Sequence, residues 1–155
     1  MSHPILLARR SFLTGITLVG LTTASRSGEA SVRELAMIVN KSCPLSELDA
    51  QGVRLHFLRQ IKEWSDGGRV RPVQQEGDVR AVFLSRVLNM SSVDYERYWL
   101  QQKYAAAESP PKIVEGNAAV VKFVGLIKGA IGFVNAAAID DEAKSRVKAV
   151  LRVSY

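Results

Sequence analysis

The 155-residue sequence contains few of the residues on which most enzyme chemistry depends. It has one cysteine and two histidines, and His56 is the only histidine beyond the first 30 residues. The single cysteine, Cys43, excludes a disulfide within the chain, and no cysteine–histidine cluster has the ligand spacing of a zinc site. The sequence has neither a glycine-rich phosphate loop with its lysine nor a G-x-S-x-G turn. It therefore predicts a protein that is not an enzyme and that holds no metal or cofactor.

The sequence also lacks any block of like charge. Its formal net charge is +6, but lysine and arginine are scattered, without a basic run or a stripe of aromatic and basic residues. Clustered charge of that kind marks nucleic-acid-binding proteins, so we expect no nucleic-acid partner. Mild basicity favours a small anionic ligand, and it is also typical of an ordinary soluble surface.

The N-terminal segment has the features of an export signal. Residues 12–24 form an apolar stretch that is too short to span a bilayer and fits the hydrophobic region of a signal peptide. Arg9 and Arg10, followed by Ser-Phe-Leu, resemble the twin-arginine export signal of bacteria. An ordinary secretory signal and an uncleaved anchor are the alternatives. We expect an export signal at residues 1–30, the only membrane contact of the chain, and a periplasmic domain at residues 31–155.

Beyond residue 30, short apolar runs alternate with segments of helical periodicity. The expected strands comprise residues 35–39, 69–74, 112–114, 130–134 and 147–153. Helices are expected after Ser46 and Asp49, after an N-cap at Asp78, after Ser91, and over residues 117–128. Strands that alternate with helices predict an α/β layer structure with a partly parallel sheet.

Two local patterns favour structural roles. Tyr95, Tyr98 and Trp99 have helical spacing, which predicts packing rather than a binding platform. In the segment KGAIGFV, Gly129 follows a helix and is expected to cap it in a left-handed conformation. Gly132 lies within the expected strand, where a missing Cβ lets a neighbouring element approach closely.

Three segments resemble, in the same order, parts of the phosphate-binding receptors of ABC transporters. They are FLRQIKEWSDGGRVRPVQ (57–74), GDVRAVFLSRVLNMSSVDYERYW (77–99) and VEGNAAVVKFVGLIKGAIGFV (114–134). The resemblance implies a single lobe of the periplasmic-binding-protein type II fold, with a mixed, mostly parallel sheet flanked by helices. It further implies a solute-binding protein, with phosphate or another small oxyanion as ligand and an ABC permease or another envelope protein as partner.

The anion would lie where loops follow strands, because open α/β sheets bind ligands there and helix N-termini favour anions. Two loops fit this description, and they supply Asn40 and Ser42 from the first and Asp78 and Arg80 from the second. Asn40 and Ser42 also suit a plain turn. Arg80 could instead pair with Glu76 or Asp78 on a solvated surface.

The second loop departs from the pattern of the family. The family has Arg-Ser-Asp-Gly-Ser-Gly-Thr, whereas residues 74–80 read QQEGDVR. Two hydroxyl donors are missing, and Glu76 and Asp78 add negative charge where an anion would bind. An alternative function follows: an envelope protein-interaction or signalling module that keeps the binding fold without an anion pocket.

Overall fold

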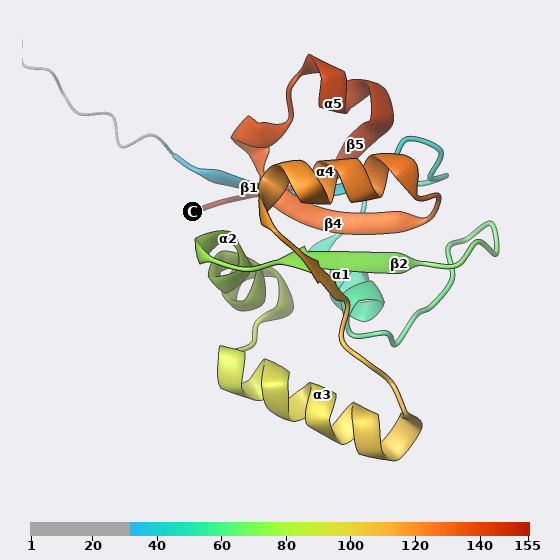
Figure 1. Ribbon diagram of the computed structural model, residues 1–155, viewed down its shortest axis with the longest axis vertical. Coiled ribbons are helices and arrows are strands. Elements are labelled where there is room, and N and C mark those ends of the chain that lie inside the picture. The colour runs from blue at the N-terminus through green and yellow to red at the C-terminus, as the bar shows by residue number, and fades with distance from the viewer. Residues whose placement is uncertain (1–31) are drawn as a thin grey trace, which may run out of the picture. The chain divides into compact units, whose positions relative to one another are not determined.

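The computed structural model describes residues 32–155. The expected export segment, with Arg9 and Arg10, lies outside the described residues. The strands are β1 (Glu34–Asn40), β2 (Arg71–Gln75), β3 (Lys112–Val114), β4 (Ala130–Asn135) and β5 (Val147–Ser154). The helical elements are α1 (Ala50–Phe57), α2 (Asp78–Val82), η1 (Phe83–Leu88), α3 (Ser92–Ala106), α4 (Gly116–Leu126), η2 (Ala136–Ala138) and α5 (Asp141–Arg146). Every expected strand is present, with ends shifted by two residues or fewer (Figure 1).

The five strands form one mixed sheet in the order β3-β2-β4-β1-β5. Strand β2 runs parallel to β3 and β4, whereas β1 runs antiparallel to β4 and β5. The predicted α/β class with a mixed sheet flanked by helices is confirmed, although two of the four pairings, rather than most of them, are parallel.

The strand directions create two unlike ends of the sheet. Strands β2, β3 and β4 all finish at one end, which we call the carboxyl edge. They begin at the opposite end, the amino edge, and β1 finishes there because it runs antiparallel to β4. Figure 1 shows the carboxyl edge at the left, where α2 and α4 begin.

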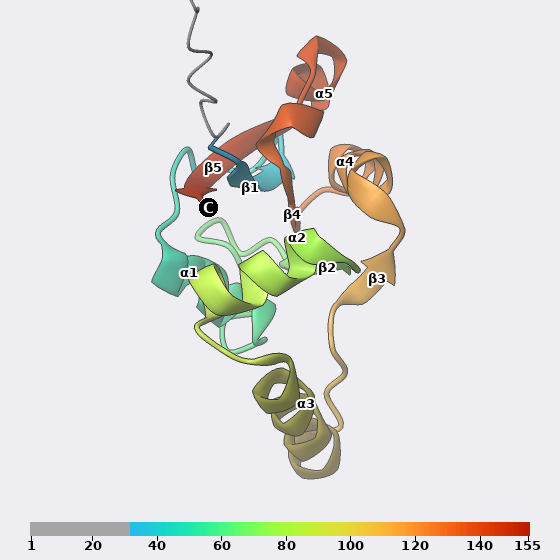
Figure 2. The same cartoon turned by 90° about the vertical axis from the view of Figure 1, so that its left-hand side faces the viewer.

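Helices cover both faces of the sheet, so the chain has two hydrophobic clusters. Leu35, Met37 and Val39 of β1 face the cluster that contains α1, η1 and α3. Ala36 and Ile38 alternate with them and face the cluster beneath α4 and α5. This alternation is the period of a strand buried on both faces. Figure 2 shows α4 on one side of the sheet and α1 and α2 on the other, with α3 farthest from it.

Aromatic side chains fill the cluster on the α1 face. The Phe83 and Phe133 rings are stacked with their centroids 4.1 Å apart, and Phe57 lies against Phe83 at 4.6 Å. Tyr95 and Trp99 of α3 are buried in the same cluster, with ring centroids 6.1 Å apart. The prediction that the α3 aromatics are packing residues is confirmed.

Of the two glycines of KGAIGFV, Gly132 has the role predicted for it, whereas Gly129 has the predicted left-handed φ but lies two residues beyond the C-cap of α4, which is Ile127. Gly129 has φ +80°, and a Cβ on it would lie 2.3 Å from the Arg69 carbonyl oxygen. A Cβ on Gly132 would lie 2.6 Å from Cγ1 of Val120, so the bare backbone lets α4 pack closely on β4. These contacts explain why glycine interrupts an apolar strand.

The two ends of the described chain meet at the carboxyl edge. Arg33 N donates to Tyr155 O at 3.2 Å, and Tyr155 N donates to Arg33 O at 2.8 Å. Between residues 32 and 155, none of the helices has the length and apolar character needed to cross a membrane.

Candidate functional site

The carboxyl edge is held together by two amide side chains. Gln75, the last residue of β2, donates from Nε2 to Asn117 Oδ1 and to Phe133 O, both at 2.9 Å. Asn117 Oδ1 also accepts a hydrogen bond from Asn135 N at 3.0 Å. These bonds fix the first turn of α4 against the ends of β2 and β4. Sequence analysis missed both residues, because neither amide belongs to a recognisable motif.

Two helices begin at this edge without a side-chain cap. Helix α2 follows β2 after Gly77, which has φ +91°, and α4 follows β3 after Glu115. The first N–H groups of a helix lack acceptors within it and carry its positive partial charge. Helix η1 continues α2 and needs no cap of its own. The other helices are capped by the side chains of Asp49, Ser91, Asn135 and Asp140. The helix starts that follow β2 and β3 are thus the ones whose first N–H groups have no side-chain acceptor.

Arg80 lies in the first turn of α2 and is largely covered. Its side chain is 18% exposed, and its Nε lies 4.0 Å from Glu76 Oε2, a loose ion pair. Its guanidinium carbon lies 5.4 Å from the centre of the Tyr95 ring. Within residues 32–155, its buried Nε has no hydrogen-bond partner. Arg80 therefore retains donor capacity beside the start of α2.

Asp78 has a different role from the one predicted. The N-cap of α2 is Gly77, and Asp78 is the first helical residue, exposed to solvent. The prediction that Asp78 caps the helix is wrong, because the left-handed φ of Gly77 turns the chain one residue earlier. Its carboxylate still interacts favourably with the positive end of the helix.

Tyr95 supports Arg80 from beneath. Its hydroxyl donates to Gln74 Oε1 at 3.1 Å, and Gln74 Nε2 donates to Pro111 O at 3.1 Å. Burial raises the pKa of Tyr95 to about 12, so the phenol is neutral at physiological pH. A cavity of about 390 Å³ opens beside Arg80, Tyr95 and Trp99. The guanidinium thus lies on a neutral ring rather than on a carboxylate.

Asn40 and Ser42 lie at the amino edge, apart from Asp78 and Arg80. Asn40 donates to Val124 O at 2.8 Å and to Gly125 O at 3.1 Å, and it accepts from Ser42 Oγ at 2.7 Å. These hydrogen bonds use the polar atoms of the Asn40 side chain and join the end of β1 to the last turn of α4. The loops do not form one site, because β1 runs antiparallel to β4 and finishes where β2 begins.

Carboxylates are concentrated at the carboxyl edge. Glu76, Asp78 and Glu115 are exposed there, each within three residues of the end of a parallel strand. Within residues 32–155, acidic, histidine and cysteine side chains form no group of three or more that could hold a metal ion. Around the starts of α2 and α4, the edge therefore combines two positive helix ends with Arg80 and three carboxylates.

The chain was compared with known proteins by sequence and by structure. No protein-family model matches the sequence, and no curated protein matches it either. Solved structures do match. A protein assigned as a phosphate ABC transporter substrate-binding protein from Clostridium perfringens, with bound phosphate, has a TM-score of 0.57 and 18% identity. This match covers 77% of the chain and 44% of the Clostridium protein.

Two further receptors match over the same share of the chain, 77%. An ABC-type phosphate transport receptor from Vibrio cholerae has a TM-score of 0.50 and 19% identity, over 46% of its length. PstS from Borrelia burgdorferi has a TM-score of 0.56 and 11% identity, over 47% of its length. The chain thus spans less than half the length of these receptors. It has the periplasmic-binding-protein fold of phosphate ABC transporter substrate-binding proteins.

Proposed function

We propose that the chain is an exported, periplasmic solute-binding domain that binds phosphate or another small oxyanion without catalysis. The observation that carries the proposal is the pair of uncapped helix starts, α2 and α4, at the carboxyl edge of a phosphate-receptor fold. Free N–H groups at a helix start form a ready anion site. An ABC permease is the partner that this function implies.

The proposed ligand contacts come from the second loop. The backbone N–H groups of Asp78 and Val79 would donate to the anion, and Arg80 would add a forked, charged donor. Glu76 and Asp78 oppose this binding by charge repulsion, so we expect affinity weaker than that of a site lined by hydroxyl donors. Asn40 and Ser42 are proposed only as residues that fix the amino edge, because their polar atoms bond to one another and to α4.

The test is isothermal titration of the full chain with inorganic phosphate and with sulfate. We expect saturable binding that Arg80→Gln weakens about 10-fold, the usual effect of losing a charged hydrogen bond. Arg97→Gln is the matched control, because Arg97 is an exposed arginine of α3 that pairs with Asp94. Absence of heat at millimolar ligand, or equal effects of both substitutions, would sink the proposal.

The three exposed carboxylates favour a second candidate function. Glu76, Asp78 and Glu115 would suit an envelope protein with a basic docking surface better than they suit an anion. In that case the domain is an interaction or signalling module. Capture of one defined envelope partner by the full chain, weakened by Glu76→Gln and unaffected by Arg80→Gln, would favour this function over anion binding.

A further inference from the structure

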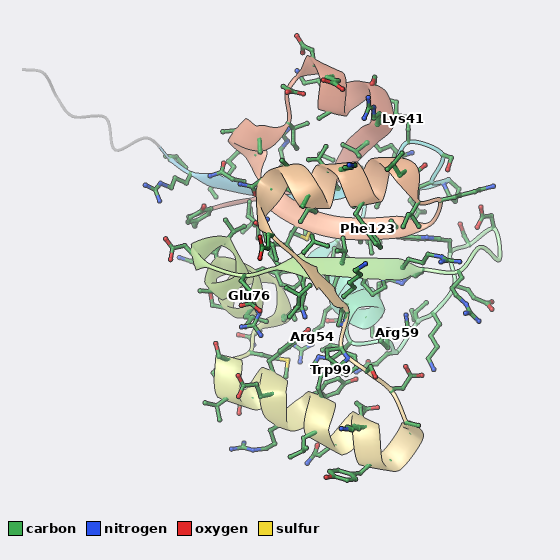
Figure 3. All side chains as sticks on the ribbon, in the orientation of Figure 1. Lys41, Arg54, Arg59, Glu76, Trp99 and Phe123 are labelled. Atoms are coloured by element: carbon green, nitrogen blue, oxygen red, sulfur yellow. The ribbon has the colours of Figure 1, made fainter. Side chains whose placement is uncertain are left out.

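The amino edge carries a basic cavity that the proposed function does not use. Its volume is about 470 Å³, and Arg59, Arg69, Arg71 and Lys112 line it together with a single carboxylate, Glu108. The cavity lies between the start of β2 and the segment that leads from α3 into β3. Figure 3 shows Arg59 and Glu76 toward opposite ends of β2, and the cavity shares Glu108, Ser109 and Pro110 with the cavity beside Arg80.

The charges in this cavity are not balanced. Within residues 32–155, Arg69, Arg71 and Lys112 have neither an ion pair nor a side-chain hydrogen bond; Lys112 lies over the Phe123 ring, 5.7 Å from its centre. The one carboxylate, Glu108, is shared between Lys62, which donates to Oε1, and Arg59, whose Nε lies 3.6 Å from Oε2. The hydrogen bond from Lys62 is the main cause that lowers the pKa of Glu108. Cations at close range repel one another, so an anion in the cavity would relieve the excess charge.

Arg59 retains an unused donor and an unusual backbone. Its Nε is buried and has no hydrogen-bond partner among the described residues. Its φ is +60°, in the left-handed region, directly after the end of α1. Glycine is the usual residue there, because a Cβ is disfavoured in that conformation. The chain thus has arginine where helix geometry favours glycine.

These observations define the ligand by its chemistry. Guanidinium groups match phosphate oxygens with paired hydrogen bonds. A volume of about 470 Å³ is in the range of small-molecule sites and exceeds what a bare oxyanion occupies. Pro110, Pro111 and Phe123 give part of the wall an apolar surface. A phosphate group that carries an organic substituent fits this combination of charge, volume and wall.

We propose that the basic cavity formed by Arg59, Arg69, Arg71 and Lys112 binds a phosphate ester. The four cations of this site are not among the residues proposed to hold the anion at the carboxyl edge, so the inference does not depend on the proposed function. The ester is either a soluble phosphorylated metabolite or the headgroup of an anionic phospholipid, since both present the same phosphate oxygens. Arg69 and Arg71 also line a neighbouring cavity of about 310 Å³, together with Ser42 and Lys128.

The experiment uses the full chain and three probes: glycerol 3-phosphate, inorganic phosphate, and vesicles of phosphatidylglycerol with phosphatidylcholine vesicles as reference. Calorimetry measures the soluble probes, and sedimentation measures vesicle binding. We expect saturable binding of glycerol 3-phosphate or of phosphatidylglycerol vesicles, tighter than that of inorganic phosphate. The probe that binds shows whether the ester is a soluble metabolite or a phospholipid headgroup.

The variants separate this site from other basic surface. Arg71→Gln is expected to weaken ester binding about 10-fold, and so is Arg59→Gln. Arg97→Gln is expected to retain wild-type affinity. Arg71 is exposed at the start of β2, so its variant should fold even if Arg59→Gln does not. Lack of saturable binding to every ester probe, or equal weakening by Arg71→Gln and Arg97→Gln, would overturn the proposal.

Discussion

The two edges of the sheet are built from the same strands but differ in helix ends and in charge. At the carboxyl edge, two uncapped helices begin beside three exposed carboxylates and Arg80. At the amino edge, α1 and α4 end, and two cavities share Arg69 and Arg71. The comparison shows that the fold places two positive helix starts at the carboxyl edge, whereas the cluster of arginine and lysine side chains lies at the amino edge.

Glycine substitutions provide the strongest contrast between the edges. At the amino edge, Gly129→Ala would combine an unfavourable φ with a Cβ 2.3 Å from the Arg69 carbonyl oxygen. We expect a loss of about 3 kcal/mol in the free energy of unfolding. At the carboxyl edge, Gly77→Ala has a similar φ, but nothing lies within 4 Å of the new Cβ, so we expect about 1 kcal/mol. Urea denaturation of both variants measures these changes, and equal losses of unfolding free energy would contradict the expected difference between the edges.

Asn40→Ala tests whether the amino-edge loop is structural. The substitution removes two hydrogen bonds to the last turn of α4 and leaves the buried Val124 carbonyl without that donor. We expect a loss of about 2 kcal/mol in the free energy of unfolding, with phosphate affinity unchanged. Ser42→Ala, which keeps the Asn40 donors in place, is the milder control. A fall in phosphate affinity without a fall in stability would indicate that Asn40 contacts the ligand.

The structure explains why the fold was predictable and the site was not. Apolar runs such as residues 35–39 have the composition of buried strands, and the two glycines of KGAIGFV mark the turn before β4 and the close contact of β4 with α4. The direction of β1, however, depends on which strand it pairs with, and no local residue encodes that. The sequence alone therefore groups Asn40 and Ser42 with Asp78 and Arg80, although the two pairs lie at opposite edges.

The basic cavity was hidden from the sequence for a related reason. Arg59, Arg69, Arg71 and Lys112 are scattered over more than 50 positions, and only the pairing of β2 with β3 brings Lys112 beside β2. A search for runs of basic residues finds nothing in such a chain. Likewise, the missing caps of α2 and α4 become visible only when the hydrogen bonds of every helix are compared.

Neutralising the carboxylates should make the carboxyl edge a better anion site. The double substitution Glu76→Gln and Asp78→Asn removes two exposed charges next to the start of α2. We expect phosphate affinity to rise about 3-fold, the scale of exposed charge interactions, and less so at high salt. Asp141→Asn, at an exposed position of α5, is the control. A decrease in affinity would show that these carboxylates help the ligand.

Acidification should affect the amino edge through His56, which is buried against Trp64 with ring centroids 4.6 Å apart. Burial lowers the pKa of His56 below its usual 6.5, so the folded state favours the neutral ring. This contribution to stability is present above that value and is lost as the pH falls. Between about pH 7 and about pH 5, unfolding free energy should therefore fall less in His56→Gln than in the wild type. Parallel pH profiles would contradict this expectation.

The central claim is that the uncapped helix starts of the carboxyl edge bind a small oxyanion. Amide chemical shifts of the ¹⁵N-labelled full chain, followed through a titration with inorganic phosphate, test it most directly. The account predicts saturating shifts at Asp78, Val79 and Gly116 that Arg80→Gln moves to higher phosphate concentration. If these three amides do not shift at millimolar phosphate, or if the shifts are confined to the amino edge, the central claim is contradicted.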